Sequence, residues 1–157
     1  MHEAIETHLP AFLSPEQVAA SHEIMGLDTQ LIDDQTYFLI EDRDGILASG
    51  GWSYRATLFG GDHTSGRSAR RLDPATEPAR IRAMYVAARA ARRGFGRRIM
   101  SLCEDAARDA GFHRASLVAT ASGRPLYAAC GYEVEREFME MTSGGVSVPL
   151  AVMSKPL

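Results

Sequence analysis

Residues 86–100 read Val86-Ala-Ala-Arg-Ala-Ala-Arg-Arg-Gly-Phe-Gly-Arg-Arg-Ile-Met100 and place two glycines among arginines. A helix that begins at Gly94 would point the unpaired N–H groups of its first turn toward the preceding loop, where they suit a phosphate group. Gly94 and Gly96 lack a Cβ, so an anion can lie close to the backbone. Charge-assisted donors come from Arg92, Arg93 and Arg97. A short glycine pair alone is equally typical of a solvated helix start.

Regular patterns flank this loop on both sides. Upstream, residues 80–86 alternate between two faces, one with Ile81, Ala83 and Tyr85 and the other with Arg82, Met84 and Val86. This alternation predicts a strand. Downstream, apolar residues recur at helical spacing before Gly111, namely Phe95, Ile99, Leu102, Ala106 and Ala110. The segment therefore predicts a strand, an anion-binding loop and an amphipathic helix in that order.

The composition is typical of a globular protein. With 157 residues, 45% hydrophobic and 24% charged, the chain is expected to form one domain over residues 1–157 with a sizeable core. The net charge of −3 argues against general nucleic-acid binding. Cys103 and Cys130 are too few for a disulfide framework, and no apolar run reaches membrane-spanning length. The two isolated cysteines, the absence of a long apolar run and the absence of a signal-peptide pattern in the first residues predict a cytoplasmic protein without membrane partners.

The remaining elements indicate an α+β fold with a mixed sheet. Two helices are predicted at residues 2–12 and 14–25, and Ser14-Pro-Glu-Gln17 is a capping-box signature for the second. Hairpin strands are predicted at residues 36–41 and 46–52. Residues 53–79 show no periodicity, and such a long loop is either functional or disordered; it is expected to be flexible and to border the acceptor site. The order then continues with a strand at 115–120, a short helix at 122–130, and a closing hairpin at 132–141 and 146–153.

Three segments of the chain resemble the GNAT (acetyl-CoA-dependent N-acetyltransferase) superfamily, over most of residues 36–155. They are Arg82-Ala-Met-Tyr-Val86, like the family's fourth strand; Arg92-Arg-Gly-Phe-Gly-Arg97, like its pyrophosphate loop; and Leu126-Tyr-Ala-Ala-Cys-Gly-Tyr132. The resemblance implies a mixed central sheet flanked by helices and splayed between the fourth and fifth strands. Relatives usually open with a strand, but residues 1–8 do not read as one, so this strand is expected to be missing.

The resemblance also implies a function and a set of site residues. The chain is expected to move the acetyl group of acetyl-CoA, its co-substrate, to a primary amine of a small molecule or peptide, without a metal. A strand amide at Met84 or Tyr85 would stabilise the reacting oxygen, and Tyr127 would protonate the departing thiolate. The implied cofactor-binding residues are Met84, Tyr85, Val86, Arg92, Arg93, Gly94, Phe95, Gly96 and Arg97. A homodimer is left open.

The side-chain contacts to the phosphates, the general base and the acceptor pocket each have more than one candidate. Ala91 stands where the family has Gln or Arg, so any side-chain contact to the phosphates must come from Arg92 or Arg93. The general base is not identified; the candidates are Asp62, His63, Asp73, Glu77 and Glu41. Trp52 and Tyr54 are candidates for an acceptor pocket, although a lone Trp is more often part of a core.

Rival functional classes fit the chain less well. A dinucleotide-binding loop would need a third glycine where Ile99 stands, and a nucleotide hydrolase would need a lysine in its phosphate loop, whereas the only lysine is Lys155. The five histidines are scattered without metal-ligand spacing. The remaining alternative is a non-catalytic acyl-CoA binding or sensing module on the same fold, which would have no need of Tyr127 as a proton donor.

Overall fold

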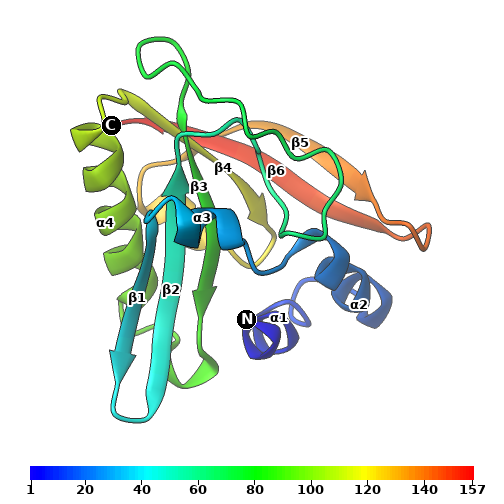
Figure 1. Cartoon of the computed structure of the whole chain (residues 1–157). Helices are drawn as coiled ribbons and strands as arrows, with labels where there is room; N and C mark the ends of the chain where they lie inside the picture. Colours follow the sequence, from blue (N-terminus) through cyan, green and yellow to red (C-terminus); the bar gives the residue numbers. More distant parts are fainter.

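A computed structural model describes residues 1–157. The protein combines helices with one six-stranded mixed sheet (Figure 1). The helices are α1 (His2–His8), α2 (Pro15–Ile24), α3 (Thr29–Asp33), α4 (Phe95–Asp109) and α5 (Arg124–Ala129), with a short 3-10 helix η1 (Ala88–Ala90). The strands are β1 (Tyr37–Asp42), β2 (Gly45–Ser53), β3 (Ala79–Val86), β4 (Arg114–Thr120), β5 (Glu133–Met141) and β6 (Ser147–Pro156). The α+β class is confirmed.

The N-terminal helices agree with the sequence patterns in part. The capping box that opens α2 is confirmed: Ser14 Oγ accepts the Gln17 N–H at 3.3 Å, and Gln17 Oε1 accepts the Ser14 N–H at 3.2 Å. The helix predicted for residues 2–12 is wrong at its end, because α1 stops at His8. Residues 1–8 thus hold a helix and no strand, as expected. Helix α3 was not predicted, since its five residues are too few to show helical periodicity. None of the helices has the length and apolar composition that crossing a membrane requires.

The sheet is divided by a divergence between β3 and β4. Its strand order is β1-β2-β3-β4-β6-β5, and β3 and β4 are parallel neighbours that pair only at Ala79↔Ala115 and Arg80↔Ser116. β4, in contrast, pairs with β6 along its whole length. The expected splay between the strands at residues 80–86 and 115–120 is confirmed. Figure 1 shows the two halves of the sheet separating toward the side where α1 and α2 lie.

A β-bulge in the middle of β3 changes which side chains share a face. Ser49 pairs with Tyr85 but Gly51 pairs with Arg82, so Ala83 and Met84 together oppose Gly50. The faces predicted for residues 80–86 are therefore wrong beyond Arg82, because an extra residue shifts the alternation by one. Ile81, Met84 and Val86 all pack on the core beside α4, whereas Arg82 and Tyr85 face the opposite side.

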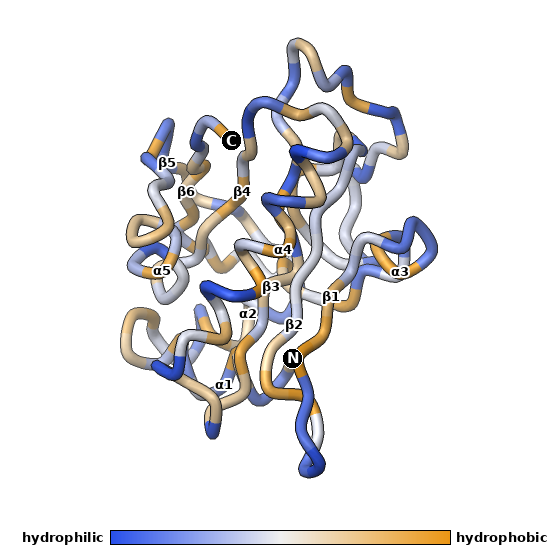
Figure 2. Tube along the Cα trace, turned by 90° about the vertical axis from the view of Figure 1, so that its left-hand side faces the viewer, coloured by the Kyte–Doolittle hydropathy of each residue, from blue (hydrophilic) through white to orange (hydrophobic).

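Two apolar clusters flank the splay. The larger one lies between the sheet and α4 and includes Trp52, Ile81, Ile99 and Phe112. The smaller one joins α1 and α2 to the outer part of β6 and includes Ile5, Leu9, Ile24, Val148 and Leu150. In Figure 2 the polar colour gathers in peripheral turns, such as the one between β1 and β2, away from these clusters. The gap between the clusters is where a ligand can enter the fold.

Candidate active site

A cavity of about 750 Å³ lies where β3 and β4 diverge. Its wall comes from α1, the end of α2, residues 58–60, β3, the η1–α4 loop, β4, α5 and β6. Nine of the ten site residues that the resemblance implies line this one cavity: Met84, Tyr85, Val86, Arg92, Gly94, Phe95, Gly96, Arg97 and Tyr127. The tenth, Arg93, is not part of the wall; its guanidinium lies 5.1 Å from the centre of the Phe95 ring.

The loop before α4 offers free backbone N–H groups at one end of the cavity. Arg92 and Gly94 have positive φ angles, +61° and +86°, and α4 begins at Phe95 without a side-chain cap. The first helical hydrogen bond runs from the Arg98 N–H to the Gly94 carbonyl at 3.0 Å, so the amides of the first turn have no partner in the helix. These amides, the helix dipole and the nearby arginines make an anion-binding site.

Gly94 and Gly96 are each required to be glycine for a different structural reason. Gly94 needs its positive φ, and a Cβ built there would meet nothing within 4 Å, so the space in front of it is open. A Cβ on Gly96 would lie 2.9 Å from the Leu126 side chain, so this glycine lets α4 approach α5 closely. The anion-binding role predicted for both glycines has a competing packing explanation at Gly96 only.

The β3 edge that faces the cavity has no strand partner beyond Arg80. An extended ligand can add to such an edge through main-chain hydrogen bonds. The bulge at this edge is strained, because Ala83 has a φ of +53°, which a residue with a Cβ rarely adopts. One carbonyl of this strand already has a hydrogen-bond partner. His8 Nε2 lies 3.0 Å from the Val86 carbonyl oxygen and must donate to it. Helix α1 also contacts η1, since Glu3 Oε1 accepts the Ala88 N–H.

Tyr127 is the buried hydroxyl-bearing side chain that α5 presents to the cavity. It is 8% exposed, and burial raises the pKa of Tyr127, so its hydroxyl stays protonated at neutral pH. The Tyr127 hydroxyl has no hydrogen-bond partner within the protein, so it can donate its proton to a ligand. The ring has space because residue 123 is a glycine: a Cβ there would lie 2.8 Å from Tyr127 Cε2. Tyr132 contacts it edge-on with ring centres 6.3 Å apart.

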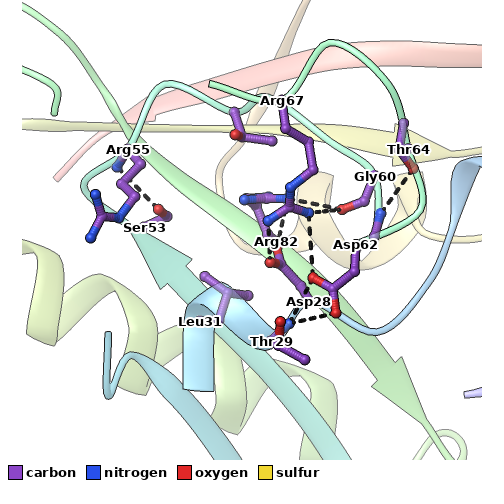
Figure 3. Close-up of polar contacts among 12 residues, drawn as sticks. Asp28, Thr29, Leu31, Ser53, Arg55, Gly60, Asp62, Thr64, Arg67 and Arg82 are labelled. Carbon is purple, nitrogen blue, oxygen red and sulfur yellow. Dashed lines mark hydrogen bonds and ion pairs between the residues drawn. The ribbon is translucent and has the colours of Figure 1, made fainter. Parts of the chain in front are cut away.

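A buried ion cluster supports the opposite end of the cavity, and sequence reasoning missed it (Figure 3). Asp28 Oδ2 lies 2.6 Å from Arg82 Nη2, and Asp28 Oδ1 accepts a hydrogen bond from Arg67 at 2.7 Å. Arg82 also donates to the Gly60 carbonyl at 2.8 Å. Burial lowers the pKa of Arg82 to about 10, against the opposing attraction of Asp28. No local pattern signals this cluster, because its members come from three separate segments.

The predicted loop at residues 53–79 is folded back on itself. Its two arms pair at the isolated bridge Arg55↔Arg71, and the Leu72 N–H donates to the Tyr54 carbonyl at 2.8 Å. Its tip crosses the end of α2, where Gly61 and Gly26 approach so closely that a Cβ on Gly61 would lie 2.7 Å from Gly26 Cα. Leu58, Phe59 and Gly60 at this tip line the cavity.

None of the five base candidates lines the cavity. Asp62 accepts the Thr29 N–H, and His63 Nε2 contacts the His22 and Glu23 carbonyls. Glu77 pairs with Arg70, which lowers the pKa of Glu77 to about 2. Asp73 accepts the Ala75 N–H, and Glu41 lies on β1. These four carboxylates and the His63 ring have structural partners or lie elsewhere in the fold.

The two aromatic candidates for an acceptor pocket also lie outside the cavity wall. Trp52 belongs to the larger apolar cluster, 6.0 Å from Phe112 and 6.0 Å from Tyr54, measured between ring centres. The pocket interpretation is therefore wrong for Trp52, and the core interpretation holds. Tyr54 lies against this cluster, with the Arg55 and Arg71 guanidinium groups over its ring.

The fold is shared with solved acetyltransferase structures. A GCN5-related N-acetyltransferase from Rhodopseudomonas palustris is similar with a TM-score of 0.70 and 15% identity, over 99% of this chain and 84% of that one. A ribosomal-protein-alanine N-acetyltransferase from Brucella melitensis is similar with a TM-score of 0.62 and 18% identity, over 97% and 96%.

A phosphinothricin acetyltransferase from Sinorhizobium meliloti, solved with acetyl-CoA, is similar with a TM-score of 0.59 and 18% identity, over 82% of this chain and 65% of that one. No curated protein sequence matches the chain. The model of the acetyltransferase (GNAT) family, however, matches residues 1–132, which include β3, the anion-binding loop and Tyr127. With most of its length matched, the chain belongs to the acetyltransferase (GNAT) family.

Proposed function

We propose that the protein transfers the acetyl group of acetyl-CoA to a primary amine. The observation that carries this proposal is the meeting of three features in one cavity: free amides before α4, an unpaired edge of β3, and the Tyr127 hydroxyl. The family is one of acyltransferases. Acetyl-CoA as the acyl donor agrees with the S. meliloti relative, which was solved with it.

Each feature accounts for one part of the donor. The free amides from Arg92 to Arg97 bind the pyrophosphate, with the flanking arginines as additional donors. The edge of β3 at Met84 and Val86 pairs with the pantetheine amides by strand addition. For this, the His8 ring has to leave the Val86 carbonyl or share it. The thioester then lies near Tyr127, between the two ends of the cavity.

In the chemical step, the neutral amine attacks the thioester carbon, the C–N bond forms and the C–S bond breaks. An amide of Met84 or Tyr85 at the bulge donates to the oxygen that gains negative charge. Tyr127 gives its proton to the departing sulfur and regains one, through water, from the nitrogen of the product. The products are the N-acetylated amine and free CoA, so no proton is gained or lost overall.

The alternative, an acyl-CoA binding module, shares the loop and the strand edge but has no use for a free buried hydroxyl. A screen with free-thiol detection separates the two. Protein and acetyl-CoA are mixed with a panel of monoamines, polyamines, amino acids and peptides, and N-acetylated products are identified by mass spectrometry. Thiol release that requires an amine supports the enzyme. If acetyl-CoA raises the melting temperature but no amine releases thiol, the binding module is the correct function.

A further inference from the structure

The ionisable side chains in the cavity wall carry positive charge or none. They are Arg82, Arg92, Arg97, His8, Tyr85 and Tyr127. All Asp and Glu residues lie outside this wall. An acceptor with several ammonium groups would need carboxylates to replace the water that it loses on binding. This wall offers none, since in the proposed function Arg92 and Arg97 bind the pyrophosphate of the donor, and Arg82 is paired with Asp28.

The end of the cavity opposite the anion-binding loop is apolar. Met25, Leu58, Phe59 and Leu150 contribute to it from three separate parts of the chain. Met25 and Phe59 pack against the smaller apolar cluster. Side chains of this kind favour a hydrocarbon or aromatic body in the ligand.

A positive charge lies next to this apolar wall. Arg82 donates to the carbonyl of Gly60, the neighbour of Phe59, and a single buried carboxylate, Asp28, serves both Arg82 and Arg67. Arg82 and Asp28 are the buried members and balance each other, while Arg67 also lies 4.0 Å from the more exposed Asp62, so the cluster has no unpaired carboxylate to offer a ligand. The cluster therefore disfavours a second ammonium group in the acceptor, and the apolar surroundings favour the neutral form of the reacting amine, which is the form that attacks.

We infer that the acceptor is a primary monoamine with an apolar body, and not a polyamine, an aminoglycoside or another polycation. This inference rests on the proposed function and names its substrate class. The apolar end of the cavity holds the body of the amine, and the reacting nitrogen lies toward Tyr127.

The test uses hexylamine and 1,6-diaminohexane, which have the same chain length and differ in one terminal group. We expect kcat/KM to be about 10-fold higher or more for hexylamine, since a second ammonium group would enter an apolar site that has no carboxylate to pair with it. Equal rates or a preference for the diamine would overturn the inference, while thiol release by either amine would leave the proposed function standing.

Matched variants test whether this wall causes the preference. Phe59→Glu and Met25→Glu place a carboxylate in the cavity at half-buried positions and should narrow or reverse the preference for hexylamine. Phe138→Glu is the control, because Phe138 is also half-buried and lies 6.1 Å from the Phe59 ring centre but outside this cavity. The inference is wrong if all three variants change the preference equally.

A binding measurement decides the case in which neither amine is acetylated, which would count against the proposed function. The melting temperature of the complex with CoA is then compared with each amine added. A larger rise with hexylamine supports the apolar monoamine site, and an equal or larger rise with the diamine contradicts it.

Discussion

The two ends of the cavity are built differently. The anion-binding end is one continuous stretch from η1 to the first turn of α4, and its donors are exposed backbone amides. The opposite end is assembled from the end of α2, the tip of the 53–79 loop and β6, and the buried Asp28–Arg82 pair supports it. In the proposed function the first end binds the pyrophosphate of the donor and the second holds the acceptor, so a change confined to the second end should leave donor binding intact.

The largest effect is expected at the anion-binding end. Gly94→Val should weaken acetyl-CoA binding about 100-fold, because valine at a φ of +86° costs about 1–3 kcal/mol and its side chain enters the open space before the amides. Calorimetric titration measures this. Gly111→Val is the control, since Gly111 has a similar φ of +88° at the other end of α4. Unchanged affinity in Gly94→Val would remove the pyrophosphate assignment.

The next effect concerns the stability of the opposite end. Asp28→Ala leaves Arg82, 4% exposed, without its carboxylate and should lower the free energy of unfolding by about 3 kcal/mol. Urea unfolding measures this loss. Acetyl-CoA affinity should hardly change, because the anion-binding loop has no contact with the cluster.

Asp62→Ala is the matched control for Asp28→Ala. Asp62 is 41% exposed and 4.0 Å from Arg67, so its removal should cost about 1 kcal/mol or less. Equal losses in the two variants would show that Asp28 does not hold this end together.

The sequence was informative where the structure is local. The capping box at Ser14, the strand at residues 80–86 and the glycine loop each depend on neighbours within a few residues, and all are present. The bulge was missed because it requires a positive φ at Ala83, and alanine does not favour a positive φ, so the residue type gives no sign of a bulge. The Asp28 cluster and the apolar wall were missed because they form only when distant segments pack together. Substrate specificity therefore could not be predicted from sequence patterns.

The smallest effect is expected outside both ends, at the exposed pair of Arg70 and Glu77. Arg70 lowers the pKa of Glu77 to about 2, so any stability from this pair is present above the ordinary value near 4.5 and is lost as the pH falls toward 2. Glu77→Gln should leave the melting temperature at pH 7 and the acetylation rate nearly unchanged. Thermal melts from pH 2 to pH 7, with rate measurements at pH 7, check this; a large loss of rate would instead make Glu77 a base.

Tyr127 is the residue on which the proposed chemistry depends most. Tyr127→Phe should lower kcat about 10²-fold, because a general acid acts only as charge develops on the sulfur, and should leave the Kd for acetyl-CoA unchanged. Tyr132→Phe is the control, since the Tyr132 hydroxyl is buried outside the cavity. The direct measurement is kcat with a reactive amine beside the Kd for acetyl-CoA in both variants. A loss of kcat in Tyr127→Phe alone, at constant Kd, is the predicted result, and wild-type kcat in Tyr127→Phe across the pH range would contradict it.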